Sequence, residues 1–388
     1  MREDRKKIFI RTFGCQMNVR DSEVVAGLLR RAGYSLTDDE SAADVVIFNT
    51  CSVRQHAEDK VWSAVGNIVK RAKAQKEAKA RGIKKPLIGL IGCMAQNYRE
   101  QVFERSPGVD FAVGPSDIEK IPGIIGQLSA KGLYERKIWE TDGQVRPEDI
   151  YHTGFYADPE HAYVVISEGC SNYCSYCVVP YVRGSLHNRG HQGILKEIRS
   201  ALANGVSRVT LLGQNVNAYQ DGNFSFIDLL QAVNKLPGLQ EFTFVTSHPR
   251  DTTPELFRVM AGCDKLKKNL HLPVQSGSDK VLKAMNRGYT RKFYLDLADN
   301  YRKIVKGGTL TTDIIVGFCG ETEEDFRDTF DLVKAVEFNA AYIFKYSPRP
   351  GTKALDRPDD VTVEEKERRH ALILDLQKSI CAQKKVKK

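Results

Sequence analysis

Each of the first three apolar, β-rich segments of this chain ends in a cysteine. Helical patterns separate these segments, which are KIFIRTFGC (7–15), ADVVIFNTC (43–51) and PLIGLIGC (86–93). The βαβ alternation predicts an α/β domain with a parallel sheet, of the flavodoxin or Rossmann type, over residues 1–127. Parallel strands present their carboxyl ends along one edge, where open α/β folds bind ligands. We therefore expect Cys15, Cys51 and Cys93, here called the sheet trio, to form a shared metal site.

A second alternating block follows and predicts a partial (β/α)6 barrel over residues 161–362. Between the two blocks, residues 128–160 are polar and aperiodic, which indicates a connector. Residues 363–388 read as one amphipathic terminal helix. By analogy with the complete barrel, we expect the chemistry at the carboxyl ends of the barrel strands. The strand candidates are residues 162–169, 208–215, 241–247, 269–274, 309–318 and 340–347.

Three further cysteines crowd into the stretch EGCSNYCSYCVVP, just past the first barrel strand. These residues, Cys170, Cys174 and Cys177, are here called the barrel trio. Thiolates in a compact loop are the usual ligands of a [4Fe–4S] cluster. Three thiolates leave one iron open, and an open coordination position can bind a substrate or cofactor. Zinc is the alternative, with His187 or His191 as the fourth ligand.

Composition narrows the class of protein. Nine cysteines are an odd number, and no apolar run approaches the ~20 residues that span a bilayer. The N-terminus has no apolar signal core. We therefore expect a cytoplasmic chain with no membrane partner, in which clustered cysteines indicate metal or redox chemistry rather than disulfides.

The net charge of +9 permits a polyanionic partner, and the positive charge is unevenly distributed. Residues 70–85, KRAKAQKEAKARGIKK, carry eight Lys or Arg against one Glu. One interpretation is a solvated helix face, and the other is contact with nucleic-acid phosphates. The candidate RNA-binding residues in this run are Lys79, Arg81, Lys84 and Lys85.

The barrel trio, spaced C-x3-C-x2-C after the first strand of a partial barrel, resembles the radical S-adenosylmethionine enzymes. Its surroundings resemble the methylthiotransferase family over roughly residues 7–355. Within this family, GCQMN, CSVR and GQNVNAY look most like the branch that methylthiolates isopentenylated (dimethylallyl) adenosine in tRNA. The other segments that carry the resemblance are NTCSVRQHAEDK, GCMAQ, TSHPRD, HLPVQSGSDKVLKAMNRGYT, TDIIVGFCGETEEDF and YSPRPGT.

The resemblance implies two [4Fe–4S] clusters and S-adenosylmethionine as cofactors. The barrel trio would hold the cluster at which S-adenosylmethionine is reductively cleaved to a 5′-deoxyadenosyl radical. The sheet trio would hold an auxiliary cluster whose open iron carries the sulfur that becomes methylated. The radical would remove hydrogen from C2 of the adenine, and the methylthio group would be delivered there. The implied partners are a tRNA anticodon stem–loop and an electron donor such as flavodoxin, and we expect a monomer.

Several polar residues that follow barrel strands are candidates for the S-adenosylmethionine or adenosine pocket. The resemblance places Tyr176 near the adenine of S-adenosylmethionine. The remaining candidates are Gln214, Asn215, Ser247, His248 and Gln275. The alternative is that they are ordinary loop residues that cap helices. Cys263 and Cys381 lie in helical stretches and are predicted to be small apolar side chains, and no catalytic residue is assigned.

The sequence departs from the family in three places. In the family motif R-G-x-E-x-S-R-P, Leu186, Asn188 and Gly190 replace the acid, the serine and the proline. Cys319 stands where the family usually has proline, and we expect an inert thiol there. Relatives continue into a C-terminal β-barrel domain that grips tRNA, which is absent before Lys388, so weaker tRNA binding is expected.

These departures leave other functions open. Within the family, the same chemistry could act on threonylcarbamoyl-adenosine in tRNA or on a ribosomal-protein aspartate. From a different class, the chain could be a non-catalytic iron–sulfur module that binds RNA.

Overall fold

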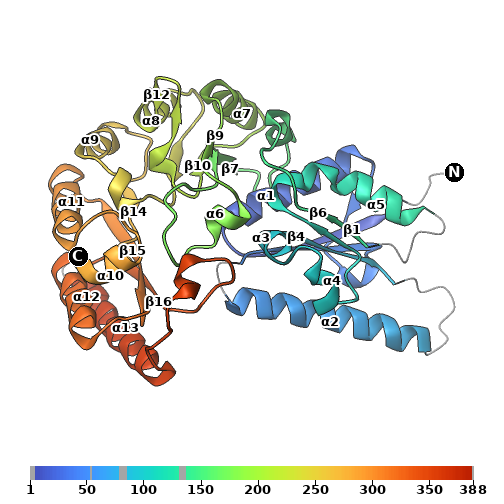
Figure 1. Ribbon diagram of the computed structural model, residues 1–388. Helices are drawn as coiled ribbons and strands as arrows, with labels where there is room; N and C mark the ends of the chain where they lie inside the picture. Colours follow the sequence, from blue (N-terminus) through green and yellow to red (C-terminus); the bar gives the residue numbers. More distant parts are fainter. Residues whose placement is uncertain (1–4, 53–54, 78–84, 131–136, 387–388) are drawn as a thin grey trace. The chain divides into compact units, whose positions relative to one another are not determined.

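The computed structural model describes residues 5–52, 55–77, 85–130 and 137–386, which form two compact units (Figure 1). Unit 1 comprises Met1–Pro159 and Tyr181–Gly184, and unit 2 comprises Glu160–Pro180 and Ser185–Lys388. Both units are α/β structures built on parallel strands, so the predicted fold class is confirmed. No helix of the described residues is long and apolar enough to cross a membrane.

Unit 1 is built on one parallel sheet in the order β2-β1-β3-β4-β5-β6. This is the flavodoxin-like order with a sixth strand added, as the sequence predicted. Strand β3 is buried at every position, which explains its uninterrupted apolar run, since helices cover both of its faces. The strands are β1 (Lys7–Phe13), β2 (Ser35–Leu36), β3 (Val45–Thr50), β4 (Leu87–Gly92), β5 (Phe111–Val113) and β6 (Ile138–Glu140).

Helices cover both faces of this sheet, with α1 and α5 on one side and α2, α3 and α4 on the other (Figure 1). On the second face, Val61, Val65 and Ile68 of α2 recur at helical spacing and pack with Phe48 and Leu90 of the strands. The helices are α1 (Gln16–Arg31), α2 (Gln55–Glu77), α3 (Cys93–Tyr98), α4 (Gln101–Arg105) and α5 (Ile121–Ser129), with 3₁₀ turns η1 (Glu40–Ala42), η2 (Pro115–Lys120) and η3 (Glu148–His152).

The stretch expected to be a connector, 128–160, belongs to unit 1 almost entirely, so the unit ends near Pro159 rather than near residue 127. Its strand β6 pairs with β5. Its later part is tied to α1, because Arg20 donates to the backbone oxygens of Tyr151 (3.0 Å) and Phe155 (3.1 Å). These segments are held by polar contacts instead of periodic apolar residues, and hydrophobic patterning therefore could not reveal them.

Unit 2 contains the six predicted barrel strands, all parallel, in two sheets ordered β7-β10-β13 and β14-β15-β16. The backbone N–H of Phe242 donates to the oxygen of Lys265 (2.9 Å), and the N–H of Lys267 donates to the oxygen of Phe242 (2.9 Å), which connects β13 to the chain just before β14. The partial (β/α)6 barrel is therefore confirmed. Its strands are β7 (His161–Val165), β10 (Arg208–Leu212), β13 (Glu241–Phe244), β14 (Asn269–His271), β15 (Thr309–Val316) and β16 (Ala340–Lys345).

Capping residues in the sequence explain where several barrel helices begin. Ser225 and Asp228 form a reciprocal capping box at the start of α8, and Thr322 and Asp325 do the same for α12. The helices are α6 (Val179–Val182), α7 (His191–Ala203), α8 (Phe226–Asn234), α9 (Pro254–Gly262), α10 (Asp279–Ala284), α11 (Arg291–Ile304), α12 (Glu323–Val336) and α13 (Val363–Val386). Short elements complete the unit: β8 (Ser167–Glu168), β9 (His187–Asn188), β11 (Gln220–Asp221), β12 (Phe224–Ser225), η4 (Val216–Ala218), η5 (Pro249–Asp251) and η6 (Lys353–Asp356).

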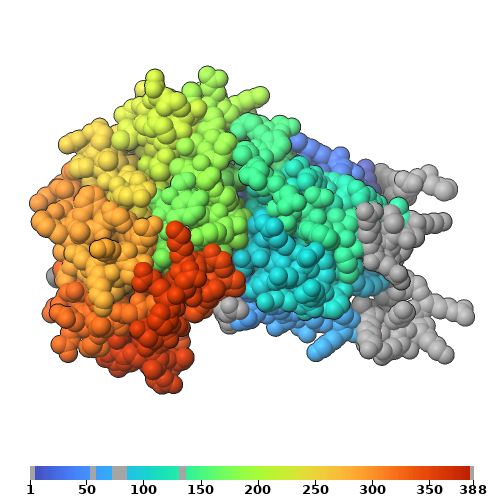
Figure 2. All heavy atoms as spheres, in the orientation of Figure 1, coloured from blue at the N-terminus to red at the C-terminus, as the bar shows by residue number. Residues whose placement is uncertain are grey.

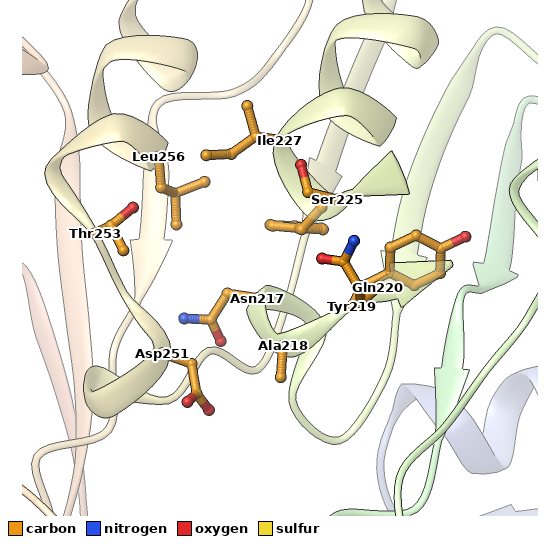
Figure 3. Close-up of a pocket in the computed structure, with 10 residues that line it drawn as sticks. Asn217, Ala218, Tyr219, Gln220, Ser225, Ile227, Asp251, Thr253 and Leu256 are labelled. Carbon is orange, nitrogen blue, oxygen red and sulfur yellow. The ribbon is translucent and has the colours of Figure 1, made fainter. Parts of the chain in front are cut away.

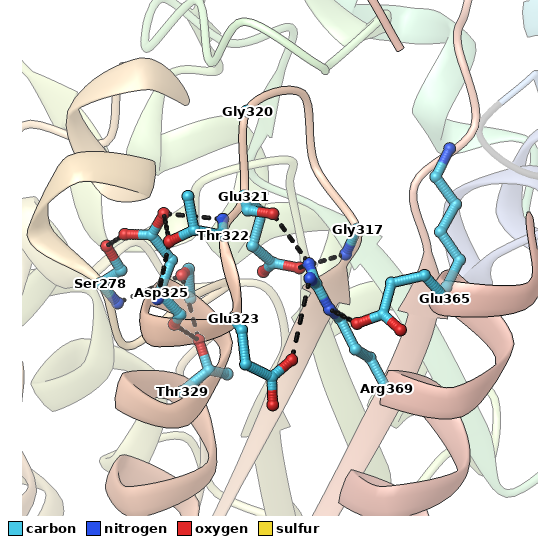
Figure 4. A network of polar contacts seen from close by, with 12 residues as sticks. Ser278, Gly317, Gly320, Glu321, Thr322, Glu323, Asp325, Thr329, Glu365 and Arg369 are labelled. Atoms are coloured by element: carbon cyan, nitrogen blue, oxygen red, sulfur yellow. Dashed lines mark hydrogen bonds and ion pairs between the residues drawn. The ribbon is translucent and has the colours of Figure 1, made fainter. Parts of the chain in front are cut away.

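The terminal helix α13 forms as predicted, but its contact face is largely polar. It packs on β16 and α12, and Figure 2 shows the red C-terminal segment lying directly against the orange atoms of the segments before it. Arg369 donates to the carboxylate of Glu321 (2.7 Å) and to that of Glu365 (2.7 Å) (Figure 4). The buried face consists of Lys366, Arg369, Ile373, Gln377 and Ile380.

Replacing Arg369 with Met should loosen α13. The side chain of Glu321 is fully buried, and burial raises its pKa even beside Arg369, so the variant would leave this carboxyl without its cation. Removing one partner of a buried pair costs about 3 kcal/mol. Amide exchange of residues 363–380, followed by mass spectrometry, should accelerate about 100-fold. The neighbouring Arg368, 45% exposed, is the control, and R368M should change exchange less than about fivefold. Equal acceleration of amide exchange in R369M and R368M would show that burial of the Arg369–Glu321 pair is unimportant.

Candidate metal centres

The sheet trio lies at the carboxyl ends of three adjacent strands of unit 1. Cys15 follows β1 and is the N-cap of α1, Cys51 follows β3, and Cys93 follows β4 as the first residue of α3. The sheet order reverses direction between β1 and β3, and this switch point is where flavodoxin-like folds bind ligands. The convergence that the strand ends predicted is therefore present.

Two glycines allow the strand ends to approach each other at the sheet trio. Gly14 has φ +146° and Gly92 has φ +90°, both in the region that favours glycine. A Cβ on Gly14 would lie 2.7 Å from the Cβ of Cys51, and one on Gly92 would lie 2.5 Å from Oδ1 of Asn49. The Gly-Cys pairs of the sequence are thus required by close approach of the backbone.

A buried pair of asparagines fixes the first turn of α1 against the end of β3. Nδ2 of Asn18 donates to Oδ1 of Asn49 (2.9 Å) and to the backbone oxygen of Thr50 (3.2 Å). In return, Nδ2 of Asn49 donates to the backbone oxygen of Asn18 (2.8 Å). These contacts hold Cys15 and Cys51 in register. Sequence reasoning quoted both asparagines within motifs without assigning them this role.

The electrostatic environment of the sheet trio favours thiolate at its exposed member. A hydrogen bond with Cys51, the Arg183 guanidinium, and the backbone N–H groups of Asn18 and Met17 lower the pKa of Cys15 to about 6. Burial raises the pKa of Cys93, which also interacts with Cys15. Cys15 is therefore close to both other members. Three thiols at one sheet edge, one of them ionised near neutral pH, fit the ligand set of an iron–sulfur cluster.

The barrel trio lies on the loop between β8 and α6, and backbone contacts within unit 2 hold this loop. The N–H of Cys177 donates to the oxygen of Cys174 (2.9 Å), which closes a turn. The N–H of Ser175 donates to Met285 (3.0 Å), and its oxygen accepts from Ala354 (2.7 Å). Segments more than 100 residues away in sequence thus shape the cysteine loop.

A buried arginine from one of these segments contacts the barrel trio directly. Nη1 of Arg287 donates to Sγ of Cys174 (3.3 Å), and its Nη2 donates to the backbone oxygen of Pro273 (2.7 Å). The adjacent Asn286 donates from Nδ2 to the backbone oxygen of Tyr173 (3.0 Å). The motif AMNRGYT was quoted from the sequence, but its arginine was not predicted as a site residue.

Burial dominates the titration of two barrel thiols. It raises the pKa of Cys170, and it raises the pKa of Cys177 to about 12. The charge of Arg287 acts in the opposite direction on both. A thiolate in this loop therefore needs a bound cation, which is what a cluster iron supplies.

His248 presents a neutral ring to the barrel trio. Burial, and then the charges of Arg287 and Arg250, lower its pKa to about 2. Its Nδ1 accepts from the backbone N–H of Arg250 (3.2 Å), so the ring proton is on Nε2. Nε2 lies 4.0 Å from Sγ of Cys174.

Two family models match the chain: the Uncharacterized protein family UPF0004 over residues 7–114 and the Radical SAM superfamily over residues 164–333. A relative from Carboxydothermus hydrogenoformans, named tRNA-2-methylthio-N(6)-dimethylallyladenosine synthase, is 42% identical over 381 residues, which cover 97% of this chain and 84% of the relative. A relative of the same name from Moorella thermoacetica is 43% identical over 97% of this chain and 83% of its own length. This chain belongs to the tRNA-2-methylthio-N(6)-dimethylallyladenosine synthase family.

Solved structures support the fold of this chain. The radical S-adenosylmethionine methyltransferase TsrM from Kitasatospora setae matches with a TM-score of 0.60 at 15% identity, covering 87% of this chain and 73% of that chain. The cobalamin-dependent S-adenosylmethionine radical enzyme OxsB matches with a TM-score of 0.55 at 12% identity, over 98% of this chain and 56% of that chain. Family membership confirms the cofactors expected from the sequence, S-adenosylmethionine and [4Fe–4S] clusters.

Buried polar atoms without a hydrogen-bond partner in the described part of the protein lie at the ends of two barrel strands. Oε1 of Gln214 and Oδ1 of Asn215, after β10, have no hydrogen-bond partner among the described residues, and neither does Oγ of Ser247, after β13. Buried polar atoms are normally paired, so these atoms are available to a ligand. Gln275 has φ +70°. Its backbone N–H donates to the oxygen of Asp313, and its backbone oxygen accepts from the N–H of Ile315 (both 2.9 Å).

Tyr176 directly precedes the third cysteine, and its hydroxyl lies 3.4 Å from Nη1 of Arg287. Its position near the adenine of S-adenosylmethionine stays a prediction. Tyr176 packs against a core cluster that includes Cys319. Cys319 is buried there, as expected of an inert thiol, and burial raises its pKa. Cys263 is also buried. Cys381 is not a purely apolar side chain, because it hydrogen-bonds with Gln377 and Asn339. All nine cysteines lie within the described residues, and none forms a disulfide.

Of the two histidines in the zinc alternative, His191 has its ring engaged by other residues. Nδ1 of His191 lies 2.6 Å from Oδ2 of Asp221, and its ring stacks on Phe224. His187 is exposed and pairs with Glu168 in the short β8–β9 ladder. Among the described residues, no three His, Cys, Asp or Glu side chains converge to hold a single metal ion. A cluster has a different requirement, because each of its cysteines binds a separate iron.

The altered segment of the synthase motif retains its two arginines in buried positions. Arg189 donates to Glu197 (2.7 Å) in unit 2, and Arg183 donates to Asp21 (2.7 Å) in unit 1. Among the replaced positions, Gly190 is exposed, and Leu186 and Asn188 are half-buried. The substitutions thus spare the parts of the motif that are packed into the units.

A pocket of about 380 Å³ opens beside the barrel rim, between the starts of α8 and α9 (Figure 3). Asn217 and Asp251 lie on its wall, and Asn217 also donates to the backbone oxygen of His248 (3.0 Å). The six trio cysteines are not among its lining residues. The pocket therefore adjoins the His248 loop but is separate from the thiols.

Most of the predicted RNA-binding run lies outside the described residues. Lys79, Arg81 and Lys84 fall there, so the structure does not place them. Nζ of Lys85 forms an ion pair with Asp110 (3.2 Å). A second pocket, of about 730 Å³, lies along α2 and reaches the start of this run at Arg71. It is lined by Arg11, Phe13, Glu40, Asp59, Lys60, Ser63, Ala64, Asn67 and Arg71. Its mixed charges give no preference for an anion.

Proposed function

We propose that this chain adds a methylthio group to C2 of N6-dimethylallyladenosine next to the anticodon in tRNA. The observation that best supports this proposal is the 42% identity, over 97% of the chain, to a relative named for that product. The placement of both cysteine trios at strand ends supports it. We propose the barrel trio as the ligands of the radical-generating cluster and the sheet trio as those of the auxiliary cluster.

The loaded barrel site supplies reductive cleavage of S-adenosylmethionine, and the loaded sheet site supplies the inserted sulfur. The chain's own residues prepare these sites. Arg287 places a positive charge beside the Cys174 sulfur, and neutral His248 directs its Nε2–H toward the same atom. The unpaired oxygens of Gln214 and Ser247 are proposed to orient S-adenosylmethionine or adenosine.

Partners and location complete the proposal. The relatives' names support tRNA as substrate, and the basic run 70–85 is the proposed contact with its phosphates. Reductive cleavage consumes an electron from outside the chain, which supports a donor such as flavodoxin. Monomeric state and cytoplasmic location stay predictions.

The test uses the purified chain, loaded anaerobically with iron and sulfide. It is incubated with S-adenosylmethionine, a reductant and tRNA that carries N6-dimethylallyladenosine, and the digested tRNA is analysed by mass spectrometry. We expect the 2-methylthio nucleoside together with 5′-deoxyadenosine. Matched tRNA that lacks the dimethylallyl group is the control and should give no product.

Three outcomes would contradict the proposal. Parallel reactions replace the dimethylallyl tRNA with tRNA that carries threonylcarbamoyl-adenosine or with ribosomal protein. A product only on the threonylcarbamoyl-adenosine tRNA would move the substrate to another branch of the chemistry, and a product only on ribosomal protein would exclude tRNA as the target. Failure to cleave S-adenosylmethionine with both clusters loaded would favour a non-catalytic RNA-binding module.

A further inference from the structure

A buried arginine lies against the sheet trio, and it comes from an unexpected part of the chain. Arg183 is six residues past the last barrel cysteine, Cys177, yet the segment Tyr181–Gly184 packs as part of unit 1. Its side chain is only 3% exposed. Nε of Arg183 lies 3.3 Å from Sγ of Cys93, at a distance suited to an N–H···S hydrogen bond.

A carboxylate holds this arginine in place from the other side. Nη2 of Arg183 donates to Oδ2 of Asp21 (2.7 Å), while Nη1 of Arg146 donates to Oδ1 of the same carboxylate (2.7 Å). Asp21 is buried, which raises its pKa, but the two guanidinium groups lower that pKa below its usual value. Asp21 is on α1, six residues after Cys15. The support is thus anchored on the same helix that begins at the trio.

Arg183 brings a positive charge to the Cys93 sulfur, which a cluster would hold as a thiolate. Its fork geometry lets it bond the carboxylate with one nitrogen and the thiol with another.

We infer that Arg183 is a positioning residue of the auxiliary cluster, whose Nε–H donates to the Cys93 sulfur and whose charge favours the reduced cluster. The inference rests on the cluster assignment of the proposed function. Hydrogen bonds to cluster sulfurs and nearby positive charge raise a cluster's reduction potential. The stretch directly after the barrel trio would thereby tune the cluster of the sheet trio.

A purely structural role is the competing explanation, because Arg183 also anchors its segment through Asp21. Arg146 distinguishes the two. It bonds the same carboxylate and is equally buried, and its Nε donates to the backbone oxygen of Pro115 (2.7 Å), whereas the Nε of Arg183 lies against Cys93. An R146M variant should weaken the ion-pair group while leaving the N–H···S contact.

The experiment uses the full chain with C170A, C174A and C177A, so that the auxiliary cluster is observed by itself. Its midpoint potential is measured by redox titration followed by visible absorption and electron paramagnetic resonance. R183M should lower the equilibrium constant for reduction of the cluster about tenfold. For one electron, this lowers the midpoint potential by about 60 mV. R183K, which keeps the charge but loses the fork, should lie between R183M and the parent. R146M should stay near the parent potential even where its thermal stability falls.

Each alternative outcome has a distinct meaning. A parental potential in R183M with full iron content would overturn the inference and leave the proposed function intact. Equal shifts in R183M and R146M would overturn it in favour of a structural role. If R183M cannot hold iron, R183K decides, and a parental potential and spectrum in R183K would exclude the N–H···S contact as the cause. Absence of iron in the parent would instead contradict the proposed function.

Discussion

Replacing the barrel trio with alanine should abolish cleavage of S-adenosylmethionine. The loop of Cys170, Cys174 and Cys177 is the only part of the described barrel that brings three thiols together. Two cysteine trios imply about eight irons per loaded chain, so the triple variant should retain about four. Iron is measured colorimetrically after anaerobic reconstitution, and 5′-deoxyadenosine is measured by chromatography with dithionite as reductant.

Cys263 provides the matched control for this experiment. It is a buried cysteine of the same unit that belongs to neither trio. C263A should therefore keep about eight irons and normal cleavage. Zinc in place of iron, or an unchanged iron content in the triple variant, would be incompatible with a cluster at this loop.

The positions of the six trio cysteines could be inferred from the sequence because the strands that carry them have strong local signals. The uninterrupted apolar runs of β3 and β4, which precede Cys51 and Cys93, are visible without any knowledge of tertiary contacts. Once the strands are known to be parallel, their carboxyl ends must share an edge. The prediction of a connector over residues 128–160 missed β6 for the opposite reason. This strand is only three residues long and is defined by its pairing with β5.

The charged partners of the cysteines could not be inferred in this way. Arg183 reaches Cys93 across 90 residues, and Arg287 reaches Cys174 across 113. Sequence patterning reports which face of an element is apolar, but not which distant cation a buried thiol will meet. Both arginines lie in segments that carry the family resemblance. Only the structure shows that each places a guanidinium nitrogen 3.3 Å from one sulfur of its trio.

This shared arrangement supports the proposal that the thiols of each trio serve as cluster ligands. A cluster held by three thiolates is anionic, and removing it from water is costly without a compensating charge. One buried arginine per trio supplies that charge and an oriented donor. The Asp21 carboxylate and the Pro273 carbonyl in turn fix the two guanidinium groups, so each donor is held before the cluster is bound.

Replacing the sheet trio with alanine should separate radical formation from sulfur insertion. Cys15, Cys51 and Cys93 belong to unit 1, whereas the barrel trio belongs to unit 2. The triple variant should therefore still convert S-adenosylmethionine to 5′-deoxyadenosine within about twofold of the parent, which corresponds to less than 0.5 kcal/mol in the barrier. The 2-methylthio nucleoside should disappear from the tRNA digest, because the proposed carrier of the sulfur is gone. Methylthiolated product at the parental rate would show that the sulfur comes from another source, and loss of both activities would show that the two sites do not work independently.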